Sequence, residues 1–224
     1  EPARLPALMA CLKELEHTQH IRDEVVNLGP EHDAFDFEDP WARLDYTERL
    51  LLYFLYVFMP GYMLVFNGQL FGRQHAYKKE IEKTLPAPRV ADADSAERET
   101  GKRLFRLRRD YPQLVSGDYR LLENGQQDVI CLARFDASEI VIGVINANSV
   151  AKKVVLSLTD IISGRPNSSD GEHAHYTQDV LLLKNLAEGW TTETRDNISA
   201  EKLLQEGLPV RVAPRSCQVV RLHL

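Results

Sequence analysis

The sequence is poor in cysteine and lacks a hydrophobic run long enough to cross a membrane. Its three cysteines, Cys11, Cys131 and Cys217, lie far apart and form no CxxC pair. This pattern argues against a disulfide framework and against a zinc site. The apolar run at 50–60 is well short of the roughly 18 residues that a spanning helix needs. We therefore expect free, buried thiols in a reducing compartment and no insertion into a membrane.

Basic residues are also too few for a nucleic-acid-binding surface. The chain of 224 residues has 27 Lys and Arg against 33 Asp and Glu, which gives a net charge of −6. The densest basic run, "KRLFRLRRD" at 102–110, has Leu104, Phe105 and Leu107 spaced through it. This spacing predicts an amphipathic helix with a solvated basic face. No signal peptide is visible at the start, so we expect a cytoplasmic protein.

The chain changes character near residue 115. Before it, apolar spacing predicts helices near 5–15, at 48–58 with Thr47 as its cap, and at about 95–109. Short strands are predicted at 25–28 and 62–66, the second buried on both faces as in a parallel sheet. After it, about seven short segments rich in β-branched residues are typical of an antiparallel sandwich or small barrel. We predict an α+β chain divided into 1–114 and 115–224.

Acidic residues gather between the first predicted strand and the helix at 48–58. His32 and Asp33 come just after that strand, where catalytic groups lie in α/β barrels, although an exposed Asp that caps a turn would look the same. Asp36, Glu38 and Asp39 could bind calcium through oxygen ligands. Their spacing matches no calcium loop, which favours a solvated acidic loop and leaves calcium open.

Other local patterns each have two readings. Trp41 and Trp190 lie in polar surroundings, where each could stack on a sugar or serve as a partly buried anchor. His173 and His175, with acidic neighbours, could hold a metal, but the Ser/Asp/Gly-rich context favours a surface hairpin loop. The chain has no GxSxG, no phosphate-binding glycine loop and no HExxH. Local chemistry therefore names no enzyme, and we expect no cofactor.

A wider pattern emerges when the motifs are taken in order. Glu31-His32-Asp33 comes about thirty residues before a segment, 60–72, that begins with Pro-Gly and keeps glycines at 61, 68 and 72. Then follow "LR" (107–108), "PQL" (112–114), "GDY" (117–119), "VICLAR" (129–134), "VIGVINAN" (141–148) and "LPVRVAPRSCQVVRLHL" (208–224). In this order the set resembles the C-terminal third of the α-amylase family, glycoside hydrolase family 13.

The resemblance implies both a fold and a function. Residues 1–114 would end a (β/α)8 barrel with its strands seven and eight, and residues 115–224 would form the antiparallel C-terminal β-sandwich. Asp33 would match the acidic residue that stabilises the transition state, and His32 and Trp41 would contact the sugar of an α-glucan. Retaining hydrolysis needs two carboxyl groups roughly 5 Å apart. In the family, the nucleophile and the general acid lie on strands four and five. The resemblance thus implies the C-terminal region of an α-glucan hydrolase or transglycosylase that is not catalytically complete.

Departures from the family pattern support an alternative. Asn is replaced by Glu31, and the segment at 60–72 differs from the family at Met63, Phe66, Gln69 and Leu70. A divergent non-catalytic module would then act as a scaffold, an oligomerisation surface or a weak carbohydrate binder. The unpaired strands of a partial barrel also predict either a homodimer or packing of the barrel part onto the sandwich.

Overall fold

The computed structural model describes residues 4–17, 25–26, 44–63, 95–163, 175–183 and 190–223. The helices are α1 (Arg4–His17), α2 (Tyr46–Phe58), α4 (Ser95–Asp110), α5 (Gln113–Ser116), α6 (Thr159–Ile162) and α7 (Ala200–Glu206). The strands are β1 (Val25–Val26), β2 (Tyr62–Met63), β3 (Asp118–Leu121), β4 (Val129–Phe135), β5 (Glu139–Asn146), β6 (Lys152–Leu156), β7 (His175–Leu183), β8 (Trp190–Ser199), β9 (Leu208–Val212) and β10 (Ser216–His223).

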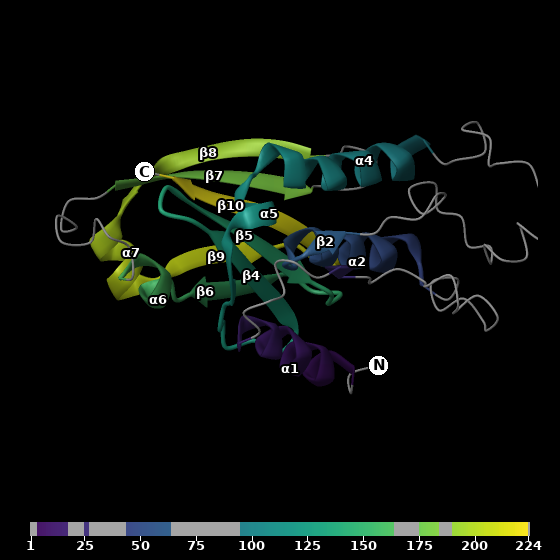
Figure 1. Cartoon of the computed structure of the whole chain (residues 1–224), viewed down its shortest axis with the longest axis horizontal. Helices are drawn as coiled ribbons and strands as arrows, with labels where there is room; N and C mark the ends of the chain where they lie inside the picture. Colours follow the sequence, from purple (N-terminus) through teal and green to yellow (C-terminus); the bar gives the residue numbers. More distant parts are fainter. Residues whose placement is uncertain are drawn as a thin grey trace, which may run out of the picture.

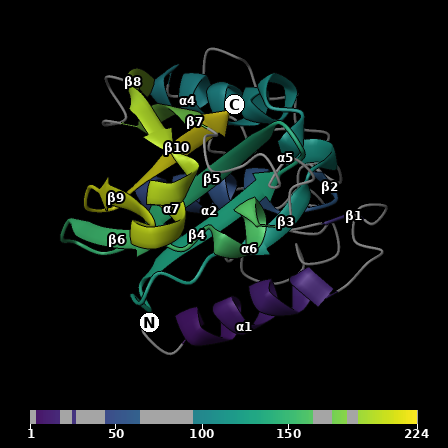
Figure 2. The same ribbon diagram turned by 90° about the vertical axis from the view of Figure 1, so that its left-hand side faces the viewer.

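A six-stranded antiparallel sheet is the centre of the molecule. Its strand order is β3-β4-β5-β10-β7-β8, while β6 and β9 form a separate antiparallel pair. Figure 1 shows α2 and α4 beside one another and α1 beyond β4. In Figure 2, α6 and α7 lie toward the viewer, and α2 and α4 lie behind the large sheet. Strands β6 and β9 share a core with α6, α7 and one face of that sheet, and α2 and α4 share a core with the other face. The large sheet is therefore covered on both faces.

Strand β5 shows why both faces need cover. All eight of its residues are buried, and its sequence, EIVIGVIN, is apolar on both sides of the strand. Ile140, Ile142 and Val144 enter a core shared with β6, β9, α6 and α7. Val141 and Ile145, pointing the other way, enter a second core shared with α1, α2 and α4. A continuous apolar run is what a strand buried on two faces requires.

Helix α2 is capped differently from the sequence prediction. Its cap is Asp45, whose carboxylate accepts a hydrogen bond from the Glu48 amide at 2.9 Å. Glu48 in turn accepts from the Asp45 amide at 2.9 Å, which completes a capping box. Thr47 was therefore wrong as the cap, because it is the second residue of the helix itself. Asp45 also pairs with Arg215 from the turn before β10.

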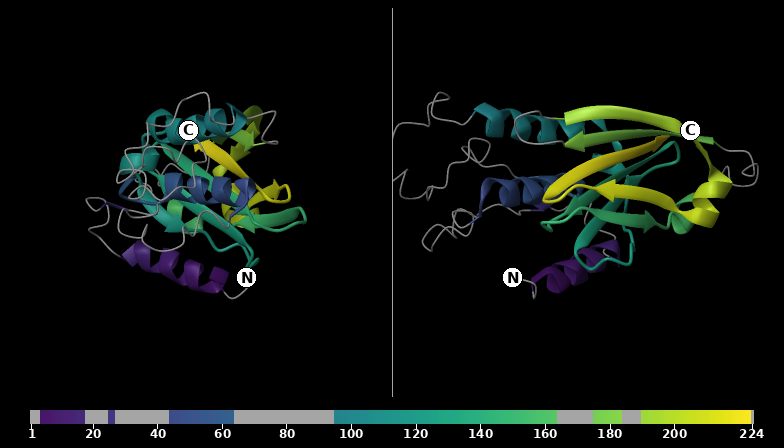
Figure 3. Two further views of the ribbon diagram at one scale, coloured as in Figure 1. Left: turned by 90° about the vertical axis from the view of Figure 1, so that its right-hand side faces the viewer. Right: turned by 180° about the vertical axis from the view of Figure 1, so that it is seen from behind.

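The apolar helix α2 is buried against the large sheet. From Leu50 to Gly61 every residue except Leu52 is buried, as the all-round apolar pattern predicts. Phe58 is fully buried and lies over Gly143 of β5, where an added Cβ would come within 2.9 Å of the ring. The left view of Figure 3 shows α2 in front of the sheet. Residues before 114 and residues after 115 thus share one core. Of the two expectations, a homodimer or packing of the first part onto the second, this core corresponds to the packing.

The two short strands before residue 114 are parallel, as expected, but they pair with each other instead of remaining unpaired. Val25 lies opposite Tyr62, and Val26 lies opposite Met63. The prediction that both faces are buried is wrong at Tyr62, which is 59% exposed. Only the first two residues of the predicted strand 62–66 fall within the described part of the chain.

The mixed class of helices and antiparallel sheet is confirmed, and the seven predicted segments after residue 115 are all strands. Strand β8 and the short helices α5, α6 and α7 were missed. The sequence of β8, WTTETRDNIS, is polar, and β8 lies at an edge of the sheet, where a strand does not need an apolar pattern. The barrel, the sandwich and the division at 114 stay predictions.

The structure also bears on the cysteines and on the expectation of no membrane-spanning helix. Cys131 and Cys217 are free and buried, but Cys11 is free and exposed, so the expectation of a buried thiol is wrong there. Burial raises the pKa of the Cys131 thiol to about 12. Within the described ranges, no helix has the length and apolar character needed to cross a membrane.

Candidate functional site

The residues predicted to contact substrate, Asp33, His32 and Trp41, lie outside the described residues, as do Asp36, Glu38 and Asp39 of the possible calcium loop. Within the described residues, no group of three or more His, Cys, Asp or Glu side chains could hold a metal ion. What the structure describes near the predicted site is the set of elements on either side of it in the chain: β1, α2 and β2.

The parallel pair β1 and β2 sets the geometry next to the predicted site. Because the two strands run in the same direction, the chain leaves both of them at the same edge. Asp33 follows β1 by seven residues, and the segment 64–72 follows β2 directly. In α/β barrels that edge carries the catalytic groups. The roles of Asp33 and His32 stay predictions, since both residues lie outside the described part of the chain.

Two arginines hold the turn that leads into β2. Arg134 Nη1 of β4 lies 3.4 Å from the carbonyl oxygen of Phe58, the last residue of α2. Arg108 Nη2 of α4 donates to the carbonyl oxygen of Gly61 at 2.5 Å. Gly61 has φ of 88°, a left-handed conformation that favours glycine, so the turn after Pro60 depends on it. The direction in which β2 leaves α2 is thus fixed from two other elements.

Arg134 is the most deeply buried charged side chain among the described residues, with 0% exposure. Besides Phe58, its Nη2 donates to the carbonyl oxygen of Gly117 at 2.9 Å and lies 3.4 Å from that of Val115. Burying a charge is costly unless hydrogen bonds compensate it, and these carbonyls supply part of that compensation. Burial also lowers the pKa of Arg108 below its ordinary value.

Sequence reasoning named neither arginine as a functional candidate. Arg134 was read only as part of the family motif "VICLAR". Arg108 was read as part of "LR" and of the solvated basic face at 102–110, yet it is partly buried and donates to Gly61. One signal was present, since Arg134 alternates in phase with Ile130 and Leu132, which face the core shared with α2. An arginine on the same side of a strand as buried apolar residues indicates a buried guanidinium that donates to carbonyl oxygens.

Asn146, in the motif "VIGVINAN", also links separate turns through hydrogen bonds to backbone carbonyls. It is fully buried, and its amide donates to the carbonyl oxygens of Val150 and Ala213, each at 2.9 Å. Its side-chain oxygen accepts from the Asn148 amide at 3.0 Å. Asn146 therefore ties the turn before β6 to the turn before β10.

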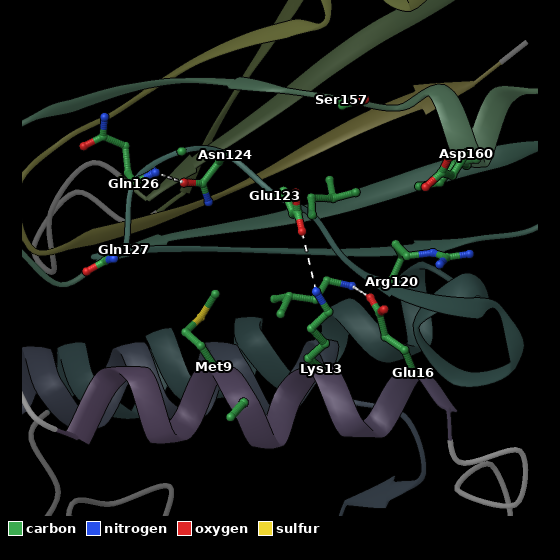
Figure 4. Close-up of a pocket in the computed structure, with 15 residues that line it drawn as sticks. Met9, Lys13, Glu16, Arg120, Glu123, Asn124, Gln126, Gln127, Ser157 and Asp160 are labelled. Carbon is green, nitrogen blue, oxygen red and sulfur yellow. Dashed lines mark hydrogen bonds and ion pairs between the residues drawn. The ribbon is translucent and has the colours of Figure 1, made fainter.

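A separate pocket lies between α1, the connection from β3 to β4, and the start of α6. Its volume is about 830 Å³. Figure 4 shows its lining, which combines polar side chains with apolar surface. The polar lining residues are Lys13, Glu16, Arg120, Glu123, Asn124, Gln126, Gln127, Ser157 and Asp160.

Some of these polar groups have structural partners. Lys13 pairs with Glu123 at 3.6 Å across the pocket, and the Glu16 carboxylate accepts a hydrogen bond from the Leu121 amide, which docks α1 on β3 (Figure 4). Tyr119 adds a second link, because its hydroxyl donates to the carbonyl oxygen of Leu12 at 3.2 Å. Arg120 differs from these residues, because its Nε is buried and has no hydrogen-bond partner among the described residues.

Comparison with known proteins gives a fold likeness without a sequence match. No protein-family model matches the chain, and no curated protein matches it in sequence. The α-amylase of Geobacillus thermoleovorans, solved in complex with acarbose, superposes with a TM-score of 0.63 at 16% identity, over 96% of this chain and 42% of that chain. An Anoxybacillus α-amylase gives 0.54 at 16% identity, over 81% of this chain and 34% of that one.

A noncanonic maltogenic α-amylase from Thermotoga neapolitana gives a TM-score of 0.53 at 16% identity, over 90% of this chain and 41% of that chain. The chain thus spans 34–42% of the lengths of these three enzymes. At such low identity the likeness establishes the fold alone. The resemblance to the α-amylase family is confirmed at that level, and the partial coverage is consistent with a C-terminal piece of such a fold.

Proposed function

We propose that this chain is the C-terminal region of an α-glucan-acting glycoside hydrolase or transglycosylase of the α-amylase family. The observation that carries the proposal is the superposition on the Geobacillus α-amylase, which takes in 96% of this chain. Residues 1–114 then correspond to the end of a (β/α)8 barrel, with β1 and β2 as its last two strands. Residues 115–224 correspond to the C-terminal β-sandwich.

The proposed site lies where the chain leaves β1 and β2. Asp33 stabilises the positive charge that develops on the sugar ring in the transition state, because a carboxylate close to that ring opposes the charge. His32 donates a hydrogen bond to a hydroxyl of the same sugar, and Trp41 offers a stacking surface. The nucleophile and the general acid come from two further carboxyl groups, as retaining hydrolysis requires. These two are absent from the chain, so the chain by itself does not complete the reaction.

Two experiments test the proposal. The gene sequence upstream of residue 1 is expected to encode an Asp and a Glu at the ends of two further barrel strands. The chain alone is expected to release no reducing sugar from starch, whereas the longer protein does. In the longer protein, Asp33→Ala is expected to lower kcat by about a hundredfold or more. Turnover by the chain alone that depends on Asp33 would contradict the proposed incompleteness.

The alternative, a non-catalytic module, makes a different prediction. If the upstream sequence lacks both carboxyl groups, the catalytic reading is wrong. The fold would then serve as a scaffold, an oligomerisation surface or a weak carbohydrate binder. Sedimentation velocity tests the proposed homodimer, and a single monomeric species at tens of micromolar would count against it.

A further inference from the structure

We propose that the β6–β9 pair is a docking site for an extended, acidic segment of a partner protein, which adds as a strand to the open edge of β6. Figure 2 shows the two strands side by side, and their register places Lys153 opposite Arg211. The next outward pair is Val155 opposite Pro209. These four residues, which we call the β6–β9 face, are all exposed, while the residues that alternate with them enter a core.

Two cations lie directly opposite one another on the β6–β9 face. Like charges at cross-strand positions repel and destabilise the pair that carries them. Among the described residues, neither Lys153 nor Arg211 forms an ion pair with a carboxylate. The preceding residue differs, because Lys152 pairs with Asp128 at 2.8 Å. A carboxylate supplied by a partner would give Lys153 the opposite charge that the chain itself does not place there.

The surface beside these cations is apolar. Val155 is 50% exposed and lies opposite the exposed Pro209. Residues two apart on a strand point to the same side, so Val155 follows Lys153 directly on the β6–β9 face. A strand added to β6 with an acidic residue beside Lys153 therefore has its next outward residue beside Val155. The partner that fits is a segment in which an acidic and an apolar residue stand two positions apart.

The edge of β6 is open to such a strand. Within the described ranges β6 pairs with β9 alone, so the groups on its other edge have no strand partner. The edge strand β3 differs, because Glu16 of α1 accepts a hydrogen bond from the Leu121 amide there. An extended peptide can add to an open edge through its backbone N–H and C=O groups, which a membrane surface cannot supply. A second copy of β6 would bring further cations to the face, so charge favours an acidic segment.

The test is a titration of the ¹⁵N-labelled chain with the acetylated and amidated hexapeptide Ser-Glu-Val-Val-Ser-Glu, followed by NMR. Its outward residues are Glu, Val and Glu in either strand direction. We expect the shifted amide signals to centre on 152–156, with a Kd that rises with salt because exposed charges are screened. The lysine peptide Ser-Lys-Val-Val-Ser-Lys should bind about fivefold more weakly or less. The acidic peptide with both valine amides N-methylated should do the same, because it loses a donor to β6 in either phase.

The variant Lys153→Glu separates binding from stability. It places an acid opposite Arg211, so the urea midpoint of the chain should rise while Kd for the acidic peptide rises about fivefold or more. The same variant should gain affinity for the lysine peptide, which a purely structural role of Lys153 does not predict. Arg103→Glu, at an exposed position of α4, is the charge-matched control and should leave Kd unchanged. If Lys153→Glu does not fold, Arg211→Glu gives the second test of the charge pair.

Several results would overturn the inference. They are an acidic peptide that shifts no β6 signal at millimolar concentration, equal binding of the lysine or N-methylated peptide, and an unchanged Kd in Lys153→Glu. Shifts of the β6 signals that depend on chain concentration alone would assign the edge to a second copy instead. Binding to phosphatidylserine vesicles without binding to the peptide would assign the face to a membrane. None of these results bears on the proposed glucan site, so the two proposals fail independently.

Discussion

At Arg134 a full positive charge sits in the core between the large sheet and α2. The guanidinium contacts carbonyl oxygens of Phe58, Val115 and Gly117, so it joins the end of α2 to the turn between α5 and β3. Each of these carbonyls belongs to a segment where the chain changes direction. One side chain therefore fixes the relative position of these two connections.

Replacing Arg134 by Met keeps most of the volume but removes every donor. We expect a loss of about 3 kcal/mol in the free energy of unfolding, because buried carbonyls are left without hydrogen bonds. Urea unfolding followed by circular dichroism measures it. Arg211→Met, at an exposed position of β9, is the matched control and should change stability by less than about 0.5 kcal/mol. Equal effects of the two substitutions would show that Arg134 does not join these segments.

At the scale of the element, the start of α2 depends on Asp45. Its carboxylate accepts from the Glu48 amide, and this bond, with the pairing to Arg215, lowers the pKa of Asp45 below its ordinary value of 3.8. Thr47 contributes to this cap through its backbone amide, which an alanine there keeps, while the side chain that caps the helix is that of Asp45. The two residues lie two positions apart, so they form a matched pair for a test.

We expect Asp45→Ala to destabilise the protein by about 1 kcal/mol at neutral pH, and Thr47→Ala to have a smaller effect. Because the folded pKa of Asp45 is depressed, its contribution is complete above 3.8 and is lost as the pH falls through the folded value. The difference between wild type and Asp45→Ala should therefore shrink below pH 3.8. Urea unfolding at a series of pH values measures it, and a difference that grows in acid would refute the cap.

The contact between α2 and β5 depends on the absence of a side chain at Gly143. A Cβ there would lie 2.9 Å from three ring carbons of Phe58. We expect Gly143→Ala to cost about 1–3 kcal/mol by overpacking. A double-mutant cycle with Phe58→Leu, measured by urea unfolding, should show that the two costs are not additive, since the smaller side chain makes room. If the two losses in unfolding free energy simply add, the cost of Gly143→Ala does not come from contact with the Phe58 ring.

At the scale of the whole molecule, one sheet serves two cores. The face of the sheet toward α2 contributes Ile130, Leu132, Val141, Ile145 and Val219, and the opposite face packs against β6, β9, α6 and α7. Stability on one side of the sheet therefore depends on the helices before residue 114 as well as on the strands after it.

This shared core makes a prediction for the isolated segment 115–224. Without α2 and α4, the helix-facing side of the sheet is an exposed apolar surface, and such surfaces drive association. We expect this segment to form oligomers in sedimentation velocity and to bind a hydrophobic dye, unlike the full chain. A monomeric segment that binds no dye would show that the second core adds little.

Much of the fold could be predicted from the sequence, but little of the site could. The elements β4, β5, β9, β10 and α4 follow from periodicity, because a residue's neighbours along a strand or helix are fixed by the local geometry. The pocket around Arg120 could not be predicted, because its walls come from α1, the β3–β4 connection and α6, which are far apart in sequence.

By itself, the sequence determined the longer helices α1, α2 and α4, most strands, the parallel direction of β1 and β2, and the resemblance to the α-amylase family, since local spacing and ordered motifs carry that information. Only the tertiary structure decided that α2 packs on the large sheet, that Asp45 caps it, that Arg134 is buried and that Arg120 faces a pocket. The physical reason is that burial and hydrogen-bond partners depend on segments that meet only when the chain is folded. No local pattern contains those contacts.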